Sequence, residues 1–174
     1  MLKAQAVSLV SAALLAATAA AGPDLGRPVS DAEIAVIDID IAPDGDGLPR
    51  GEGTVVDGID LYMDKCAACH GPRGEGVTAP ALAGGLGSLA TAKPVRTVGS
   101  YWPYATTLFD YIRRAMPYDR PMSLTNNETY ALTAYILWLN DIVGRKDVMD
   151  AQTLPKVRMP NRDGFVNGWD AESK

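Results

Sequence analysis

The stretch Cys66-Ala67-Ala68-Cys69-His70 determines what this 174-residue sequence predicts. Its two cysteines, separated by two residues and followed directly by a histidine, match the C-x-x-C-H pattern. In that pattern both thiols add to the vinyl groups of a haem, and the histidine binds the iron. The spacing has a physical cause, because cysteines three positions apart on a helical turn reach adjacent vinyl groups. The stretch therefore predicts one covalently bound haem c, held by Cys66, Cys69 and His70.

Two other chemistries also use a C-x-x-C pair. A redox-active dithiol usually lies beside a βαβ pattern, which this sequence lacks. Tetrahedral zinc needs four ligands, typically including a second pair of cysteines or histidines. The chain has only two cysteines and one histidine. Haem attachment is therefore favoured over dithiol or zinc chemistry.

The second axial position of the iron cannot be filled by another histidine of this chain. The thioether of methionine is the usual alternative, and it raises the reduction potential. Met116 is the preferred candidate because it ends a predicted helix, and Pro117 then breaks the helix and turns the chain. Met122 is the alternative, in which case Met116 would fill the core, as methionine often does.

Helical signals dominate the rest of the chain. Three capping patterns predict helix starts at residues 30–33, 54–57 and 125–128. The second of these helices leads into the cysteines, and the third begins the longest apolar pattern, which we expect to end at Gly144. A further helix is predicted over residues 104–115, before Pro117.

The first 21 residues have the features of a secretory signal peptide. Lys3 precedes an apolar, alanine-rich run, and Ala19 and Ala21 offer an A-x-A cleavage pattern. We expect cleavage after Ala21 and export, with a membrane anchor as the alternative. The remaining chain is long enough for one compact domain.

Glycine, proline and helix signals divide this remaining chain into three parts. We expect an N-terminal extension over residues 22–53, one domain over residues 54–143, and a tail over residues 144–174 that packs on the domain without regular structure. The formal net charge of −5 disfavours a nucleic-acid partner, because neutralising phosphates requires a basic face.

Residues 54–143 resemble class I cytochromes c. Gly58 and Tyr62 look like the small-plus-aromatic face with which the first helix of that family crosses the last, and Leu132 and Tyr135 look like the answering face. The resemblance implies an all-α fold of about three to five helices around one haem, with an irregular N-terminal arm and C-terminal tail.

The same resemblance extends to both sides of the haem. Pro80 and Leu82 look like the segment behind the histidine ligand, which implies a hydrogen bond from His70 to the Pro80 carbonyl. Ala115-Met116-Pro117 resembles the segment that carries the second ligand of the iron.

A narrower resemblance, to the cytochrome subunit of Sox-type sulfur dehydrogenases, covers nearly the whole chain after the signal. It rests on residues 26–35, 38–40, 43–45, 98–107, 109–117 and 159–165. The resemblance implies a molybdenum-containing partner of the sulfite oxidase type, and electrons that come from sulfane sulfur or sulfite. The described family member carries two haem domains, whereas this chain has one C-x-x-C-H.

Taken together, these features predict a periplasmic, monohaem electron carrier that serves such a dehydrogenase and passes electrons to a further cytochrome or oxidase. With both axial positions filled, the iron does not contact substrate, so we expect no enzyme activity of its own. The alternative is a haem enzyme or gas sensor with a displaceable sixth ligand. A group of aromatic and arginine residues forms either a docking or propionate-binding patch or ordinary core and solvated surface: Tyr101, Trp102, Tyr104, Arg113 and Arg114.

Overall fold

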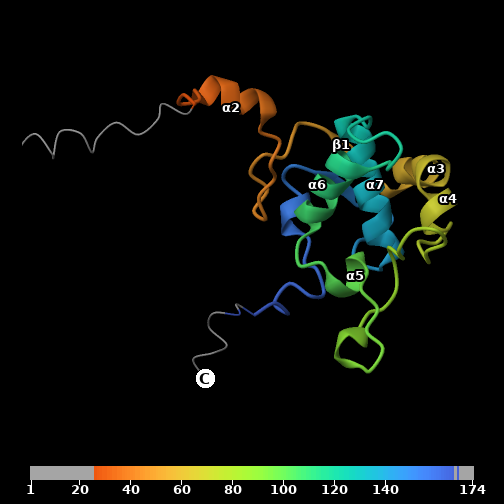
Figure 1. The fold of residues 1–174 in the computed structure, drawn as a ribbon. Coiled ribbons are helices and arrows are strands. Elements are labelled where there is room, and N and C mark those ends of the chain that lie inside the picture. Colours follow the sequence, from red (N-terminus) through yellow and green to blue (C-terminus); the bar gives the residue numbers. More distant parts are fainter. Residues whose placement is uncertain (1–25, 167, 169–174) are drawn as a thin grey trace, which may run out of the picture. The chain divides into compact units, whose positions relative to one another are not determined.

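The computed structural model describes residues 26–166 and 168 (Figure 1). These residues belong to two units, one before and one after the boundary between Asp38 and Ile39, and each is described by itself. The predicted signal peptide and its cleavage point after Ala21 lie outside the described residues. Within the described part, no helix has the length and hydropathy needed to cross a membrane.

The first unit contains one helix, α2 (Asp31–Ile37), which begins at the first predicted capping pattern. The Ser30 hydroxyl accepts a hydrogen bond from the Glu33 amide, and the Glu33 carboxylate accepts one from the Ser30 amide at 3.0 Å. Arg27 forms an ion pair with the same carboxylate. No residue of α2 is buried.

The second unit is mainly helical, as the sequence predicts. Its elements in chain order are β1 (Glu52–Thr54), α3 (Val55–Lys65), α4 (Ala67–His70), the 3-10 helix η1 (Ser88–Ala90), α5 (Val98–Tyr101), α6 (Ala105–Ala115), α7 (Asn126–Leu139), β2 (Val148–Asp150) and the 3-10 helix η2 (Leu154–Lys156). Among the described residues of this unit, five elements are α-helices, α3 to α7, which agrees with the predicted three to five; α4 and α5 are single turns that no apolar periodicity reveals.

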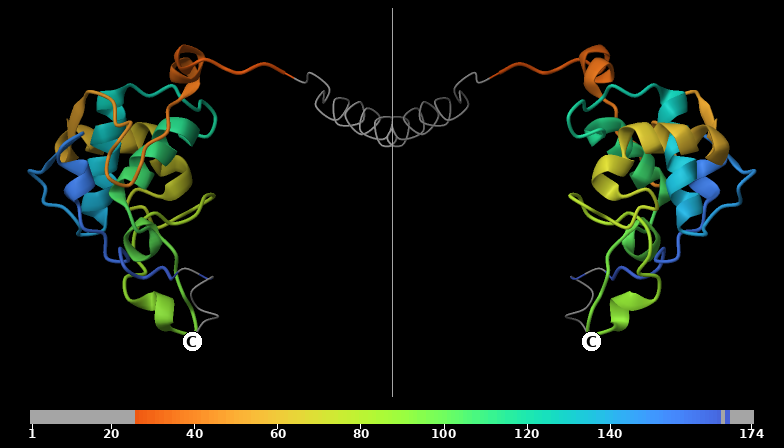
Figure 2. Two further views of the ribbon diagram at one scale, coloured as in Figure 1. Left: turned by 90° about the vertical axis from the view of Figure 1, so that its left-hand side faces the viewer. Right: turned by 90° about the vertical axis from the view of Figure 1, so that its right-hand side faces the viewer.

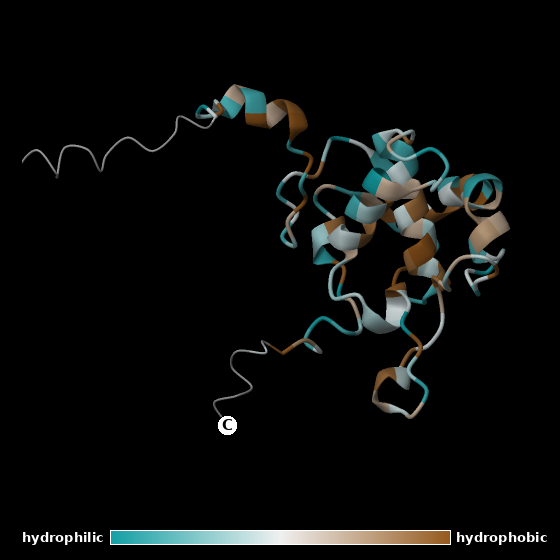
Figure 3. Ribbon diagram, in the orientation of Figure 1, coloured by the Kyte–Doolittle hydropathy of each residue, from teal (hydrophilic) through white to brown (hydrophobic). Residues whose placement is uncertain are grey.

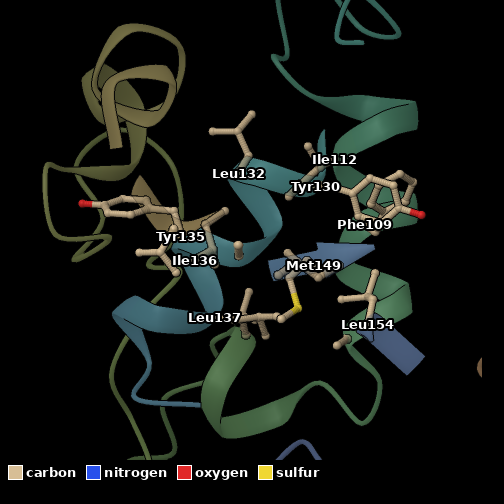
Figure 4. Packing of buried hydrophobic residues seen from close by; sticks show 14 of the residues in the cluster. Phe109, Ile112, Tyr130, Leu132, Tyr135, Ile136, Leu137, Met149 and Leu154 are labelled. Carbon is tan, nitrogen blue, oxygen red and sulfur yellow. The ribbon is translucent and has the colours of Figure 1, made fainter. Parts of the chain in front are cut away.

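Helix α7 is the central element of this unit. Nine consecutive residues of α7, from Thr129 to Leu137, are buried, and a helix that is buried all round lies inside a core. Figure 3 shows the brown, hydrophobic colouring along this helix. The Phe109 ring of α6 lies 4.4 Å from the Tyr130 ring, measured between centroids. Figure 4 shows how Met149 and Leu154 extend this core toward the tail.

Helices α3 and α7 cross at Gly58, which is buried. A Cβ atom at position 58 would overlap the Ala131 carbonyl and lie 2.7 Å from the Tyr135 Cβ atom. The Tyr62 and Tyr135 rings pack beside this contact, with centroids 5.0 Å apart. The predicted crossing is therefore present, with one correction. Ala131 faces Gly58, whereas Leu132 points toward a cavity on another side of α7.

Gly58→Val is expected to lower the thermal midpoint of unfolding while leaving haem attachment intact. Overpacking a close contact typically costs about 1 to 3 kcal/mol of unfolding free energy. The midpoint is measured by circular dichroism, with Asp60→Val as the control, because Asp60 lies on the same helix but is exposed. A Gly58→Val midpoint equal to that of Asp60→Val would contradict a tight crossing.

Helix α7 ends earlier than the sequence predicts, at Leu139 rather than near Gly144. The Asn140 side chain donates hydrogen bonds to the carbonyls of Ile136, at 2.9 Å, and Leu82, at 3.1 Å. Asp141 then adopts a left-handed conformation with φ of 56°. The Asn140 side chain and the positive φ of Asp141 therefore end α7 before the chain reaches Gly144.

The C-terminal tail is more regular than expected. Strand β2 pairs antiparallel with β1, with Gly53 opposite Met149. Figure 2 shows this blue segment beside the cyan α7. Strands of three residues are too short for a periodic pattern, which is why the sequence did not reveal them. The predicted domain boundaries at residues 53 and 143 stay predictions.

Candidate haem-binding site

The C-x-x-C-H stretch forms a single helical turn between α3 and the loop that follows. Cys66 ends α3 with its amide donating to the Tyr62 carbonyl at 2.9 Å. The amides of Cys69 and His70 in turn donate to the Cys66 carbonyl, at 3.1 and 3.0 Å. The Tyr62 hydroxyl donates to the Gly71 carbonyl at 2.8 Å, so α3 braces the turn at both ends. Both cysteines are free thiols on this turn, Cys66 half-buried and Cys69 exposed.

The orientation of His70 is fixed by Pro80. His70 Nδ1 lies 2.8 Å from the Pro80 carbonyl oxygen. A carbonyl can only accept, so Nδ1 carries a proton, and the neutral imidazole then has its lone pair on Nε2. Pro80 is itself held in place, because the Cys69 carbonyl accepts hydrogen bonds from the amides of residues 77–79. This arrangement presents Nε2 as a metal ligand and gives it the supporting hydrogen bond that ligating histidines have.

The thiol environment does not favour a redox-active dithiol. Burial raises the pKa of the Cys66 thiol to about 11, with Lys65 opposing the shift and Cys69 adding to it. The reactive cysteine of a dithiol oxidoreductase has a lowered pKa instead, because the thiolate is the nucleophile. A zinc site gains no support either. In the described ranges no three or more His, Cys, Asp and Glu residues are grouped to hold a metal ion.

A cavity of about 580 Å³ opens beside the C-x-x-C-H turn. Its volume falls within the range of about 300 to 1,000 Å³ that is usual for cofactor and ligand sites. Cys66, Cys69 and His70 form one wall. The other walls are mostly apolar and come from the loop after His70, α5, α6 and α7, and they include Leu82, Val98, Leu108, Ile112, Leu132 and Ile136.

Met116 lies in the wall of the same cavity. It directly follows α6, and its amide donates to the Ile112 carbonyl at 3.0 Å, so the helix end fixes its backbone. Met122 is 64% exposed and lies outside the cavity wall. Met149 and Met159 are buried in the core elsewhere. Among the methionines of the described residues, Met116 alone shares a cavity with His70.

Two comparisons with known proteins identify the family. The family model for cytochrome c matches residues 55–140. A chain in the crystal structure of the sulfane dehydrogenase SoxCD from Paracoccus pantotrophus is 40% identical. That match covers 88% of this chain and 76% of the other, with a TM-score of 0.79. The chain belongs to the cytochrome c family. Among curated protein sequences, none matches the chain.

Membership of the cytochrome c family confirms the resemblance to class I and Sox-type cytochromes and the mostly helical fold. It also identifies the protein as an electron-transfer protein, as a cytochrome c domain implies. Haem c is the cofactor of that family, and the Cys66–Cys69 pair has the spacing that haem attachment requires.

The residues of this cytochrome fit such a group. The cavity combines two thiols at one edge, an imidazole with a free Nε2 on one wall and a thioether on another. Lys65 and Arg96 also line it, and their charges match the two carboxylates of a haem. Neither cation belongs to a motif in the sequence. Arg96 lies in a loop without periodicity, so only its charge between Val95 and Thr97 could have drawn attention to it.

The predicted patch of aromatic and arginine residues divides into separate parts. Trp102 lines the cavity and packs edge-on against Tyr111, with ring centroids 5.7 Å apart. Arg114 lies outside the cavity wall and forms ion pairs with Asp110 at 2.8 Å and with Asp40 at 2.6 Å. The structure thus gives Trp102 a place at the cofactor cavity and Arg114 a role in bracing α6.

Proposed function

We propose that this cytochrome carries one haem c, attached through Cys66 and Cys69 and ligated by His70 and Met116. Its function is to accept single electrons in the periplasm from a molybdenum-containing sulfur or sulfite dehydrogenase and to pass them to a further cytochrome or oxidase. The observation that carries this proposal is the shared cavity, which has the C-x-x-C-H turn on one wall and Met116 on another.

The bound haem would supply a one-electron redox couple. The residues around it would set its reduction potential. The Pro80 carbonyl orients His70 through Nδ1 and makes the ligand more basic. Apolar walls around the cavity exclude water, which disfavours the more highly charged oxidised state, and methionine ligation acts in the same direction. Water exclusion and methionine ligation both favour a high reduction potential, which suits a protein that accepts electrons.

The choice of partner rests on the likeness to the SoxCD chain. That protein is a sulfane dehydrogenase, and 40% identity over most of both chains supports a similar place for this cytochrome. His70 and Met116, as the two protein ligands of a bound haem, would leave the iron no site for substrate. The placement of Met116 therefore favours an electron carrier over a haem enzyme or a gas sensor.

The proposal is tested by anaerobic reduction of the purified holoprotein. We expect sulfite or a sulfane donor to produce the α band of reduced haem only when the molybdenum dehydrogenase of the same organism is present. Omitting the dehydrogenase is the control, and dithionite reports the total reducible haem. If dithionite reduces the haem but dehydrogenase and donor together do not, the proposed partner is wrong.

A further inference from the structure

Residues 161–165 of the tail contact residues 101–104, which join α5 to α6. The Asn161 side-chain amide donates a hydrogen bond to the Tyr101 carbonyl at 2.7 Å. The Arg162 guanidinium lies over the Tyr104 ring, 4.3 Å from its centroid. The Phe165 ring packs edge-on against Tyr101 with centroids 5.2 Å apart. A hydrogen bond, a cation–π contact and an aromatic pair together hold residues 101–104 against the tail.

The segment of residues 101–104 that the tail contacts contributes to the wall of the haem cavity. Tyr101 is the last residue of α5, and its carbonyl is one of those that a helix end leaves without a partner inside the helix. Asn161 supplies that partner. The next residue, Trp102, lines the cavity. Tyr104 directly precedes α6, the helix that leads to Met116.

We propose that Asn161 is a positioning residue for the haem, which acts through Trp102 from outside the cavity. Holding the Tyr101 carbonyl keeps Trp102 in the wall and keeps water out of the cavity. Water near the iron stabilises the oxidised state, so a loosened wall lowers the reduction potential. This inference rests on the proposed function, because it requires haem in the cavity.

The test is the midpoint potential of the holoprotein, measured by spectroelectrochemical titration with chemical mediators. Asn161→Leu keeps the branching and the number of heavy atoms of the side chain but has no donor, and Asn161→Ala is the second variant should leucine impair folding. Both are uncharged, so neither changes the potential through an added charge. We expect both variants to retain haem and to shift the midpoint potential downward. An unshifted potential in both would overturn the proposal.

Arg158→Lys is the control from the same tail, and it leaves the net charge unchanged. Arg158 pairs with Asp163, and both side chains are more than 70% exposed. Arg158 is also not among the residues that line the cavity. We expect no shift of the potential in this variant. A shift equal to that of Asn161→Leu would mean that any change in the tail alters the potential, which would overturn the assignment to Asn161.

A double-mutant cycle tests whether Trp102 transmits the effect. If it does, Asn161→Leu will shift the potential in the wild-type background and will shift it little in a Trp102→Phe background. Equal shifts in both backgrounds would overturn the role of Trp102. These measurements need no dehydrogenase, so they are independent of the proposed partner. Failure of haem attachment itself would appear earlier, in the wild-type protein.

Discussion

Acid–acetone is expected to remove all haem from a Cys66→Ala/Cys69→Ala variant and none from the wild-type protein. The solvent protonates His70 and breaks its bond to the iron, but it does not break a carbon–sulfur bond. In the double variant only axial ligation would hold the haem, so extraction would be complete. The measurement is haem absorbance in the supernatant, together with the intact mass of the polypeptide.

Ala68→Ser is the matched control, because Ala68 lies between the two cysteines and is exposed. It should keep its haem through extraction. Each single cysteine variant should keep haem through one thioether, with the pyridine haemochrome band shifted by the vinyl group that remains. Haem that leaves the wild-type chain, or a mass without added haem, would disprove covalent attachment.

Met116→Leu is expected to lower the reduction potential and to open the iron to exogenous ligands such as cyanide and carbon monoxide. The thioether favours reduced iron, and its loss leaves one axial position empty. Axial ligands set haem potentials over a range of about 0.8 V, so this shift should exceed that of any wall residue. The measurements are the midpoint potential, ligand binding in the visible spectrum, and the weak near-infrared sulfur-to-iron band of the oxidised protein.

Met122→Leu is the control for this ligand. Met122 is 64% exposed, and a swap of similar volume typically costs less than about 1.5 kcal/mol of stability. We expect its potential and its near-infrared band to equal those of the wild type. If the band survives in Met116→Leu and disappears in Met122→Leu, the ligand is Met122.

Features that depend on neighbouring residues could be predicted from the sequence. All three capping boxes are present, because each depends on two side chains three positions apart. Helix α6 ends just before Met116 because Pro117 cannot continue it. The hydrogen bond between His70 and Pro80 was implied by family resemblance, and the structure contains it.

Features that depend on distant contacts could not be predicted in the same way. The pairing of β1 with β2 joins segments far apart in the chain, and neither strand has a periodic pattern of its own. The choice of Ala131 over Leu132 at the helix crossing depends on how α7 is rotated about its axis. Arg96 reaches the cavity through the path of a loop, which composition does not encode.

The helix crossing at Gly58 is independent of the segment that carries Met116. The residues that we propose to attach or ligate the haem, Cys66, Cys69, His70 and Met116, lie in the stretch of chain between Gly58 and Ala131, and the contact of these two residues closes that stretch into a ring. Met116 belongs to the ring itself, beyond the end of α6, and takes no part in the contact that closes it. With haem bound as proposed, Met116 would leave the iron by a local rearrangement of a few residues, while the contact between Gly58 and Ala131 stays closed.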